Sequence, residues 1–164
     1  MTRVYLALGS NLGDRVANLR AAVTALGPDV RVDAVSALYE TAPAYVTDQP
    51  RFLNAALAGD TDLSPRQLLA RLKAIERALG RVPGARYGPR LIDLDILFFG
   101  TQVIALPDLQ VPHALMAERE FVLRPLADIA PGLCHPQLGR TVAELLAALT
   151  PDPAMHRLTE KIAP

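Results

Sequence analysis

The order in which apolar runs and helical periodicity alternate constrains this fold more than any other feature of the sequence. Short apolar runs predict strands, and apolar side chains repeating every 3.6 residues predict helices. From the N-terminus they predict strand, helix, two strands, helix and strand, over residues 3–9, 14–26, 30–39, 52–58, 65–79 and 91–99. Two further helical patterns follow this βαββαβ series, near 121–129 and after Thr141.

The second helix has the clearest boundaries. Ser64 offers an N-cap, Pro65 suits the first helical position, and Gln67 completes a capping box. Gly80 follows the apolar stripe, where glycine commonly ends a helix. The βαββαβ order is typical of ferredoxin-like architecture, in which two helices cover one face of an antiparallel sheet. We therefore predict an α+β fold, a ferredoxin-like βαββαβ sandwich with a C-terminal elaboration.

Composition limits the number of domains and the kinds of partner. A length of 164 residues with 51% hydrophobic content fits a single domain over residues 1–164. The 17 basic and 17 acidic residues give no net charge, which argues against a broad nucleic-acid or anionic-membrane surface. No apolar stretch has the length of a membrane span, and the one cysteine, Cys134, cannot form an internal disulfide. We expect a cytoplasmic protein whose partners include neither nucleic acid nor membrane.

The segment Asp93-Leu94-Asp95 is the strongest candidate for chemistry. On a strand, side chains two residues apart leave the same face, with Cα atoms roughly 6.6 Å apart. The apolar side chains of the opposite face are expected in one core, namely Ile92, Leu94, Ile96 and Phe98. Two adjacent carboxylates repel each other, and such a pair suits Mg²⁺ together with phosphate oxygens. The alternative is that both aspartates are solvated or paired with arginines.

Basic residues precede this carboxylate pair. Residues 66–90 are strongly basic, and Glu76 is the only acid among them. Four cations of this stretch are expected on the solvated side of the helix, and three in the loop beside the aspartates: Arg66, Arg71, Lys73 and Arg77, then Arg81, Arg86 and Arg90. Loop arginines beside a metal-binding carboxylate pair can neutralise charge that develops during phosphoryl transfer. Neither a Walker loop nor a dinucleotide-binding glycine loop is present, so the phosphate chemistry would use another site.

Five segments taken together resemble the 6-hydroxymethyl-7,8-dihydropterin pyrophosphokinases, a family of folate biosynthesis. They are Gly9-Ser10-Asn11-Leu12-Gly13, Tyr39-Glu40-Thr41-Ala42-Pro43, residues 49–56, residues 88–96 and Val111-Pro112-His113. The Gly-Pro-Arg-x-x-Asp-x-Asp-Ile pattern within residues 88–96 is highly specific to that family. The resemblance runs from about residue 3 to 145. It implies a single, usually monomeric pyrophosphokinase domain of ferredoxin-like fold that transfers diphosphate from ATP to the pterin hydroxymethyl group and releases AMP.

The resemblance also implies a role for each matching residue. Asp93 and Asp95 would bind two Mg²⁺ ions, and with Arg81 and Arg90 they form the implied catalytic set. ATP, the co-substrate, would contact the nucleotide-binding positions Glu76, Arg81, Tyr87, Arg90, Ile96, His113 and Arg119. Phe52 and Phe121 would sandwich the pterin ring. The polar edge of the ring would meet the remaining substrate-binding positions, Thr41, Ala42, Pro43 and Asn54.

A function of another class is compatible with the same fold. A non-catalytic ferredoxin-like module could bind a nucleotide or metabolite as a sensor or docking domain, because this architecture hosts unrelated functions. Such a module predicts ligand binding without release of AMP. It gives no reason for two aspartates to lie beside an arginine-bearing loop.

Overall fold

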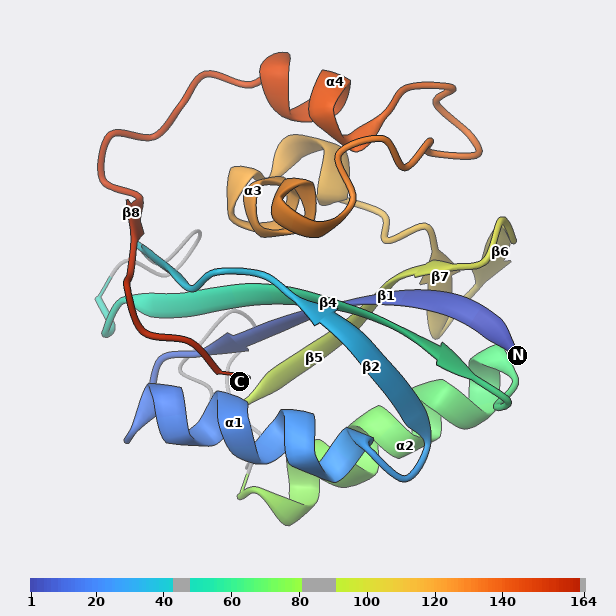
Figure 1. The fold of residues 1–164 in the computed structure, drawn as a ribbon, viewed down its shortest axis with the longest axis horizontal. Helices are drawn as coiled ribbons and strands as arrows, with labels where there is room; N and C mark the ends of the chain where they lie inside the picture. Colours follow the sequence, from blue (N-terminus) through green and yellow to red (C-terminus); the bar gives the residue numbers. More distant parts are fainter. Residues whose placement is uncertain (43–47, 81–90, 163–164) are drawn as a thin grey trace.

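An antiparallel sheet forms the middle layer of the protein (Figure 1). The computed structural model describes residues 1–42, 48–80 and 91–162. Six strands build this sheet: β1 (Thr2–Ser10), β2 (Val30–Val35), β3 (Tyr39–Thr41), β4 (Phe52–Thr61), β5 (Asp93–Phe99) and β8 (His156–Arg157). Their order is β5-β1-β4-β3-β8, and β2 also pairs with β4. The two long strands β1 and β4 therefore occupy the centre, and β5 lies at an edge.

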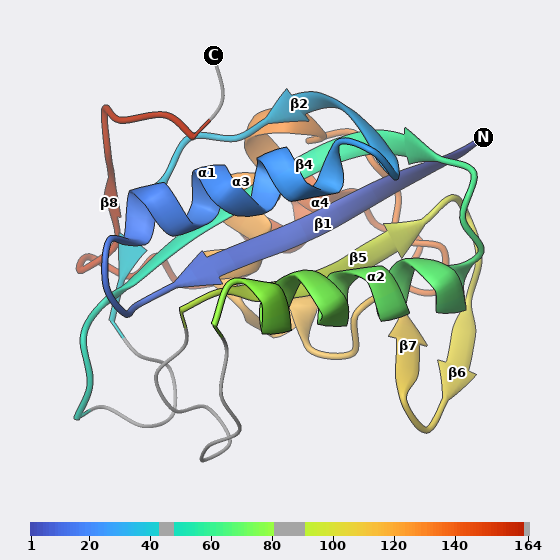
Figure 2. The ribbon, with the colours of Figure 1, turned by 90° about the horizontal axis from the view of Figure 1, so that it is seen from below.

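Helices cover both faces of the sheet. One face carries α1 (Arg15–Leu26) and α2 (Pro65–Ala78), which lie in front of the strands in Figure 2. The other face carries the short helix η1 (Met116–Glu118), α3 (Glu120–Ile129) and α4 (Val142–Ala147). A separate hairpin of β6 (Ile104–Leu106) and β7 (Leu109–Val111) follows β5. The two helices predicted to cover one face do so, and the C-terminal elaboration covers the other.

Local hydrogen bonds explain where the helices begin. The Asp14 carboxylate accepts from the Ala17 N–H at the start of α1. The predicted capping box at α2 is present, with Ser64 and Gln67 bonded to each other's backbone N–H, and Thr141 forms a second one at α4. Each cap satisfies N–H groups that the first helical turn leaves without partners.

Side chains that alternate between the two faces of the sheet pack into two separate hydrophobic cores. Leu6 of β1 and Leu57 of β4 pack with α1 and α2, where they belong to the larger apolar cluster. Tyr5 and Phe98 face the opposite way, toward a cluster that includes Met116 and the buried side chains of α3 and α4. Phe98 and Tyr5 meet edge to face, with ring centroids 6.0 Å apart.

The expectation that Phe98 shares a core with Ile92, Leu94 and Ile96 is wrong. Ile96 lies opposite Leu6 and Phe98 lies opposite Tyr5, so Leu97 is an extra residue in β5. Such a β-bulge changes which face the following side chains occupy. Phe98 therefore packs against the α3 side of the sheet, whereas Leu94 and Ile96 pack against the α2 side.

The predicted strands also differ in their bounds, since β1 and β4 are longer than expected over residues 3–9 and 52–58. The strand expected over residues 30–39 is divided into β2 and β3, because the Ser36 hydroxyl accepts from the Ala56 N–H at 2.8 Å in place of a backbone carbonyl. The strand expected from residue 91 begins at Asp93. Across residues 1–42, 48–80 and 91–162, no helix combines the length and the apolar character of a membrane span.

Gly59 lets β2 approach β4, and its replacement tests this packing. A Cβ atom at Gly59 would lie 2.5 Å from the Arg31 carbonyl oxygen, which is closer than any real contact. We expect Gly59→Ala to lower the free energy of unfolding by about 1–3 kcal/mol, as overpacking typically does. Urea unfolding followed by circular dichroism measures the change. Gly132→Ala is the control, since nothing lies within 4 Å of that Cβ; equal stability of the two variants would contradict the prediction.

Candidate active site

A cavity of about 590 Å³ opens where β1 ends and where β4 and β5 begin. Because the strands are antiparallel, these three termini meet at one end of the sheet. The segment from His113 to Val122 forms a wall on the α3 side, and the β6–β7 hairpin with Leu69 and Lys73 of α2 forms another.

Small residues make the floor of this cavity. In the register, Gly9 lies between Asp93 and Asn54, and Ala7 lies between Asp95 and Ala56. A Cβ atom on Gly9 would lie 3.4 Å from the Asn54 side-chain oxygen. The central strand therefore offers almost no side-chain volume between the two aspartates and the amide of Asn54, which leaves room for a ligand over β1.

Asp93 and Asp95 leave the same face of β5, as the sequence predicts, and both line the cavity. Burial and, second to it, the negative charge of Asp93 together raise the pKa of Asp95 from 3.8 to about 7. Two hard oxygen donors that repel each other fit a divalent cation. Outside residues 43–47, 81–90 and 163–164, no cluster of three or more Asp, Glu, His or Cys side chains could hold a metal ion. The pair therefore suits Mg²⁺, which keeps waters or phosphate oxygens as its other ligands.

Glu76 connects α2 to the strand that carries the aspartates. Its side chain is almost fully buried, and its Oε2 accepts from the Leu94 N–H at 2.9 Å. Leu94 lies between the two aspartates on the edge strand of the described sheet. Glu76 accepts the hydrogen bond of the Leu94 N–H, which would otherwise need a further strand as its partner. Glu76 itself is not among the described residues that line the cavity.

Lys73 is a cavity residue that the sequence analysis placed on the solvated side of α2. Its Nζ lies 3.3 Å from Glu76 Oε1, and its side chain lines the cavity while remaining about half exposed. The Lys73 charge lowers the pKa of Asp95 and so opposes the effect of Asp93. The helical pattern alone could not reveal this position, because it depends on where α2 packs beside β5.

His113 lies on the opposite wall as a neutral ring. Its backbone N–H donates to the Leu97 carbonyl at 3.1 Å, and its Nδ1 accepts from the Leu115 N–H at 3.4 Å. Burial lowers the pKa of His113, and the positive charge of Arg119 lowers it further. An accepting Nδ1 assigns the proton to Nε2, so the ring presents an N–H donor.

Two aromatic side chains line the same cavity from different elements. Phe52 begins β4, and Phe121 stands in the first turn of α3. The Arg119 guanidinium lies 5.5 Å from the centroid of the Phe121 ring. Nearby, the Asn54 amide donates to the Thr41 hydroxyl at 2.8 Å, which fixes the orientation of that amide.

The structure gathers most of the predicted site residues around this one cavity. Those that line it are Thr41, Ala42, Phe52, Asn54, Asp93, Asp95, Ile96, His113, Arg119 and Phe121. Four predicted residues lie outside the described residues, namely Pro43, Arg81, Tyr87 and Arg90. The β6–β7 hairpin, which contributes Pro107–Gln110 to the lining, was not predicted as part of the site. Its one charged residue, Asp108, follows Pro107 in a pair that is common in ordinary turns, so nothing in the sequence marked the hairpin as part of a site.

A family model matches most of the chain. The 7,8-dihydro-6-hydroxymethylpterin-pyrophosphokinase (HPPK) model matches residues 5–131. A 2-amino-4-hydroxy-6-hydroxymethyldihydropteridine pyrophosphokinase of Pseudomonas aeruginosa is 53% identical over 148 residues, covering 89% of this chain and 91% of that protein. A protein of the same name from Methylorubrum extorquens is 51% identical over 154 residues, covering 93% and 96%.

Solved structures share the fold at low sequence identity. A chain described as HPPK-DHPS in complex with substrates aligns with a TM-score of 0.78 at 14% identity, covering 95% of this chain and 46% of that one. Plasmodium falciparum HPPK-DHPS aligns with a TM-score of 0.70 at 19% identity, covering 90% and 43%. This chain thus spans less than half the length of these two solved chains.

The raised pKa of Asp95 predicts how stability depends on pH. Between pH 3.8 and about 7 the folded protein holds a proton on Asp95 that the unfolded chain releases. This group therefore costs stability as pH rises through that window, and the full cost is present above pH 7. In a chelating buffer, we expect Asp95→Asn to raise the free energy of unfolding by about 1–3 kcal/mol at pH 8, and by much less at pH 4.

Asp33→Asn is the matched control for that measurement. The Arg3 guanidinium holds the pKa of Asp33 below its usual value, so loss of this carboxylate should not stabilise the protein at pH 8. Denaturant titrations of both variants and the wild-type protein at the two pH values give the comparison. A stabilisation by Asp95→Asn that is the same at pH 4 and pH 8 would contradict the assignment.

Proposed function

The chain belongs to the 7,8-dihydro-6-hydroxymethylpterin-pyrophosphokinase family, and from this premise we propose that the cavity at the start of β5 is its active site. The protein is a pyrophosphokinase of folate biosynthesis, with ATP as co-substrate. The observation that carries the proposal is the position of Asp93 and Asp95, which lie together in a cavity also lined by cationic and aromatic side chains.

In the proposed site, Asp93 and Asp95 would hold two Mg²⁺ ions. When bound, these ions supply charge neutralisation and orientation for the triphosphate. Lys73 adds a positive charge on the α2 side, and Glu76 keeps that ammonium near β5. His113 donates its Nε2–H to a phosphate oxygen, which a neutral ring with an accepting Nδ1 can do. Arg119 contributes charge to the nucleotide from the α3 wall.

The remaining nucleotide contacts follow from the sequence resemblance. Arg81 and Arg90 contact the phosphates and stabilise charge on the transferring group, and Tyr87 lies near the nucleotide. Ile96 and Glu76 complete the predicted nucleotide positions. Glu76 acts through the Leu94 N–H and Lys73 rather than by direct contact, because it packs behind β5.

We place the pterin between Phe52 and Phe121, where stacking supplies affinity. Asn54, with Thr41, Ala42 and Pro43, contacts the polar edge of the ring and gives the site its specificity for a pterin. The substrate hydroxyl oxygen attacks the β-phosphorus of ATP and gives its proton to solvent as the new O–P bond forms. The bond between the β-phosphorus and the α,β-bridging oxygen breaks, and AMP leaves with that oxygen. No protein nucleophile is needed for this transfer.

The sheet order supports a ferredoxin-like classification of the core. Strands β5, β1, β4 and β2 adjoin in that order with antiparallel pairing, and α1 and α2 cover one face, as a split βαβ arrangement requires. A monomeric state and a cytoplasmic location stay predictions from the sequence. Membership of the family disfavours the alternative of a non-catalytic binding module.

Pterin-dependent release of AMP tests the proposed site. With ATP, Mg²⁺ and hydroxymethyl-dihydropterin, we expect the wild-type protein to release AMP only when the pterin is present. Asp93→Asn and Asp95→Asn should each lower kcat by about 100-fold or more at saturating Mg²⁺, since each removes a ligand that stabilises the transition-state charge.

The control is Asp33→Asn, which removes a carboxylate from β2, a strand that contributes no residue to the cavity. It should retain the wild-type rate of AMP release. Near wild-type turnover by both active-site variants would place the reaction elsewhere in the protein.

A further inference from the structure

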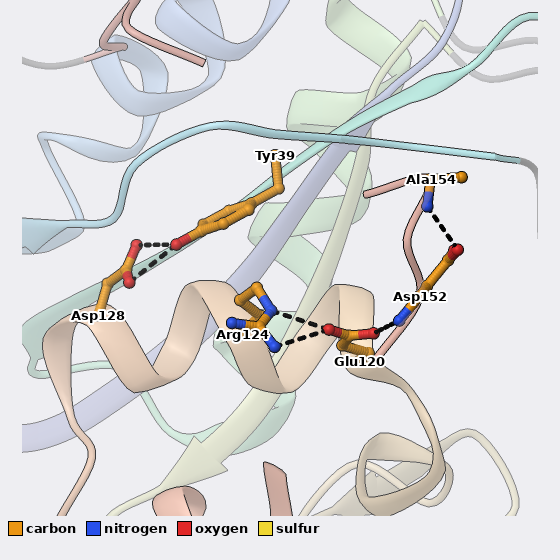
Figure 3. Close-up of polar contacts among 6 residues, drawn as sticks. All are labelled: Tyr39, Glu120, Arg124, Asp128, Asp152 and Ala154. Carbon is orange, nitrogen blue, oxygen red and sulfur yellow. Dashed lines mark hydrogen bonds and ion pairs between the residues drawn. The ribbon is translucent and has the colours of Figure 1, made fainter. Parts of the chain in front are cut away.

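A turn over residues 152–154 is hydrogen-bonded to two residues, Glu120 and Arg51, each of which directly precedes one of the two aromatic residues of the cavity. The Asp152 N–H donates to Glu120 Oε1 at 2.7 Å, and Glu120 directly precedes Phe121 (Figure 3). The Arg51 guanidinium donates to the Ala154 carbonyl at 3.2 Å, and Arg51 directly precedes Phe52. Residues 152–154 therefore connect the start of α3 to the start of β4.

The α3 end of this connection is well fixed. Glu120 Oε2 accepts from both Nε and Nη2 of Arg124 at 2.8 Å, so both carboxylate oxygens of Glu120 are engaged (Figure 3). Only 10% of the Glu120 side chain is exposed. The turn is closed by the Asp152 carboxylate, which accepts from the Ala154 N–H at 2.8 Å.

The chain beyond the turn holds it against the sheet. Strand β8 pairs with β3, and the Leu158 N–H donates to the Leu38 carbonyl at 2.8 Å. Further on, Ile162 is buried in the larger core cluster, to which Leu19 and Leu26 of α1 also belong. The turn is thus a fixed point of the fold and not a free end that follows α3.

The far end of α3 has a separate anchor. Both carboxylate oxygens of Asp128 lie 2.9 Å from the Tyr39 hydroxyl, and one also accepts from the Ala37 N–H at 3.3 Å. Burial and the neighbouring Asp128 raise the pKa of Tyr39 to about 12, so this hydroxyl stays a donor. Loss of Glu120 would therefore release the first turn of α3 and leave its last turn attached.

We propose that the turn at 152–154 sets the separation of Phe52 and Phe121, and that Glu120 and Arg51 are positioning residues for a flat ring bound between them. Neither lines the cavity. A small change in the separation of the two rings should weaken ligand binding clearly, because dispersion attraction falls steeply with distance. A gap of about 0.5–1 Å already loses a quarter to a half of the contact energy. The inference rests on the proposed function in taking that ring to be a pterin.

Calorimetric titration with 6-hydroxymethylpterin, with and without Mg²⁺ and a non-hydrolysable ATP analogue, tests the proposal. Glu120→Ala and Arg51→Met should each raise the pterin Kd by about three- to tenfold, the equivalent of one hydrogen bond. The Kd of the ATP analogue should change less than twofold in Arg51→Met. Glu120→Gln, which keeps an acceptor for the Asp152 N–H, should restore most of the pterin affinity and serves if Glu120→Ala fails to fold.

Arg20→Met is the matched control. Arg20 also donates from its guanidinium to a main-chain carbonyl of the C-terminal segment, that of Lys161, but far from either aromatic ring in the sequence. Its pterin Kd should equal that of the wild-type protein, and its thermal midpoint should match that of Arg51→Met. If Arg20→Met weakens pterin binding as much as Arg51→Met does, general loosening of the C-terminal segment explains the effect and the proposal is wrong.

The double variant separates a shared mechanism from two local ones. If Glu120 and Arg51 both act through the turn, either substitution alone already frees the distance between Phe52 and Phe121. The rise in pterin Kd of the double variant should then be clearly smaller than the product of the two single rises. A full product would overturn the proposal. Failure of the wild-type protein to bind pterin would instead refute the proposed function, and wild-type binding with unchanged Kd in all variants would refute only the role of the turn.

Discussion

The burial of Asp95 beside the like charge of Asp93 is the constraint on which the candidate site depends. Keeping two carboxylates on one face of an edge strand, partly withdrawn from water, disfavours the folded state until positive charge is supplied. Lys73 and Arg119 supply positive charge that lowers the pKa of Asp95, whereas Glu76 fixes the backbone between the two aspartates but adds its own negative charge to the repulsion. The same unfavourable charge is what a magnesium-bound polyphosphate would relieve, so binding and stability are coupled through these two side chains.

The β-bulge at Leu97 separates the site from the core on the same strand. Before it, β5 directs its carboxylates toward the α3 side and its apolar side chains toward α2. After it, Phe98 fills the α3 side and closes that end of the sheet against Met116. Leu97, two residues after Asp95, already belongs to the cluster on the α3 side, and the bulge adds the Phe98 ring to the same side. One strand therefore forms the floor of a cavity at its start and presents two consecutive apolar side chains to a hydrophobic core further on.

Features that depend on local geometry were predictable from the sequence, and those that depend on packing were not. The common face of Asp93 and Asp95 follows from strand periodicity, and the start of α2 follows from Ser64 and Gln67. The bulge at Leu97 required knowledge of the partner strand β1, because register is a property of a pair. Lys73 belongs to the cavity only because α2 lies beside β5, which no helical pattern specifies.

The aromatic side chains raise a different question, since a sandwich for a flat ring needs two walls at a defined distance. Phe52 opens a central strand, whereas Phe121 stands on a helix that reaches the sheet through side-chain contacts alone. A hydrogen-bonded sheet fixes strand spacing within tenths of an ångström, but a helix packed on apolar side chains can shift by more. Hydrogen bonds from Glu120 to residues 152–154, and from there to Arg51, fix the start of α3 relative to the start of β4. None of the described residues 152–162 lines the cavity. This part of the chain nevertheless contributes to the binding energy, because the affinity of the two aromatic rings for a flat ligand depends on where residues 152–154 hold them.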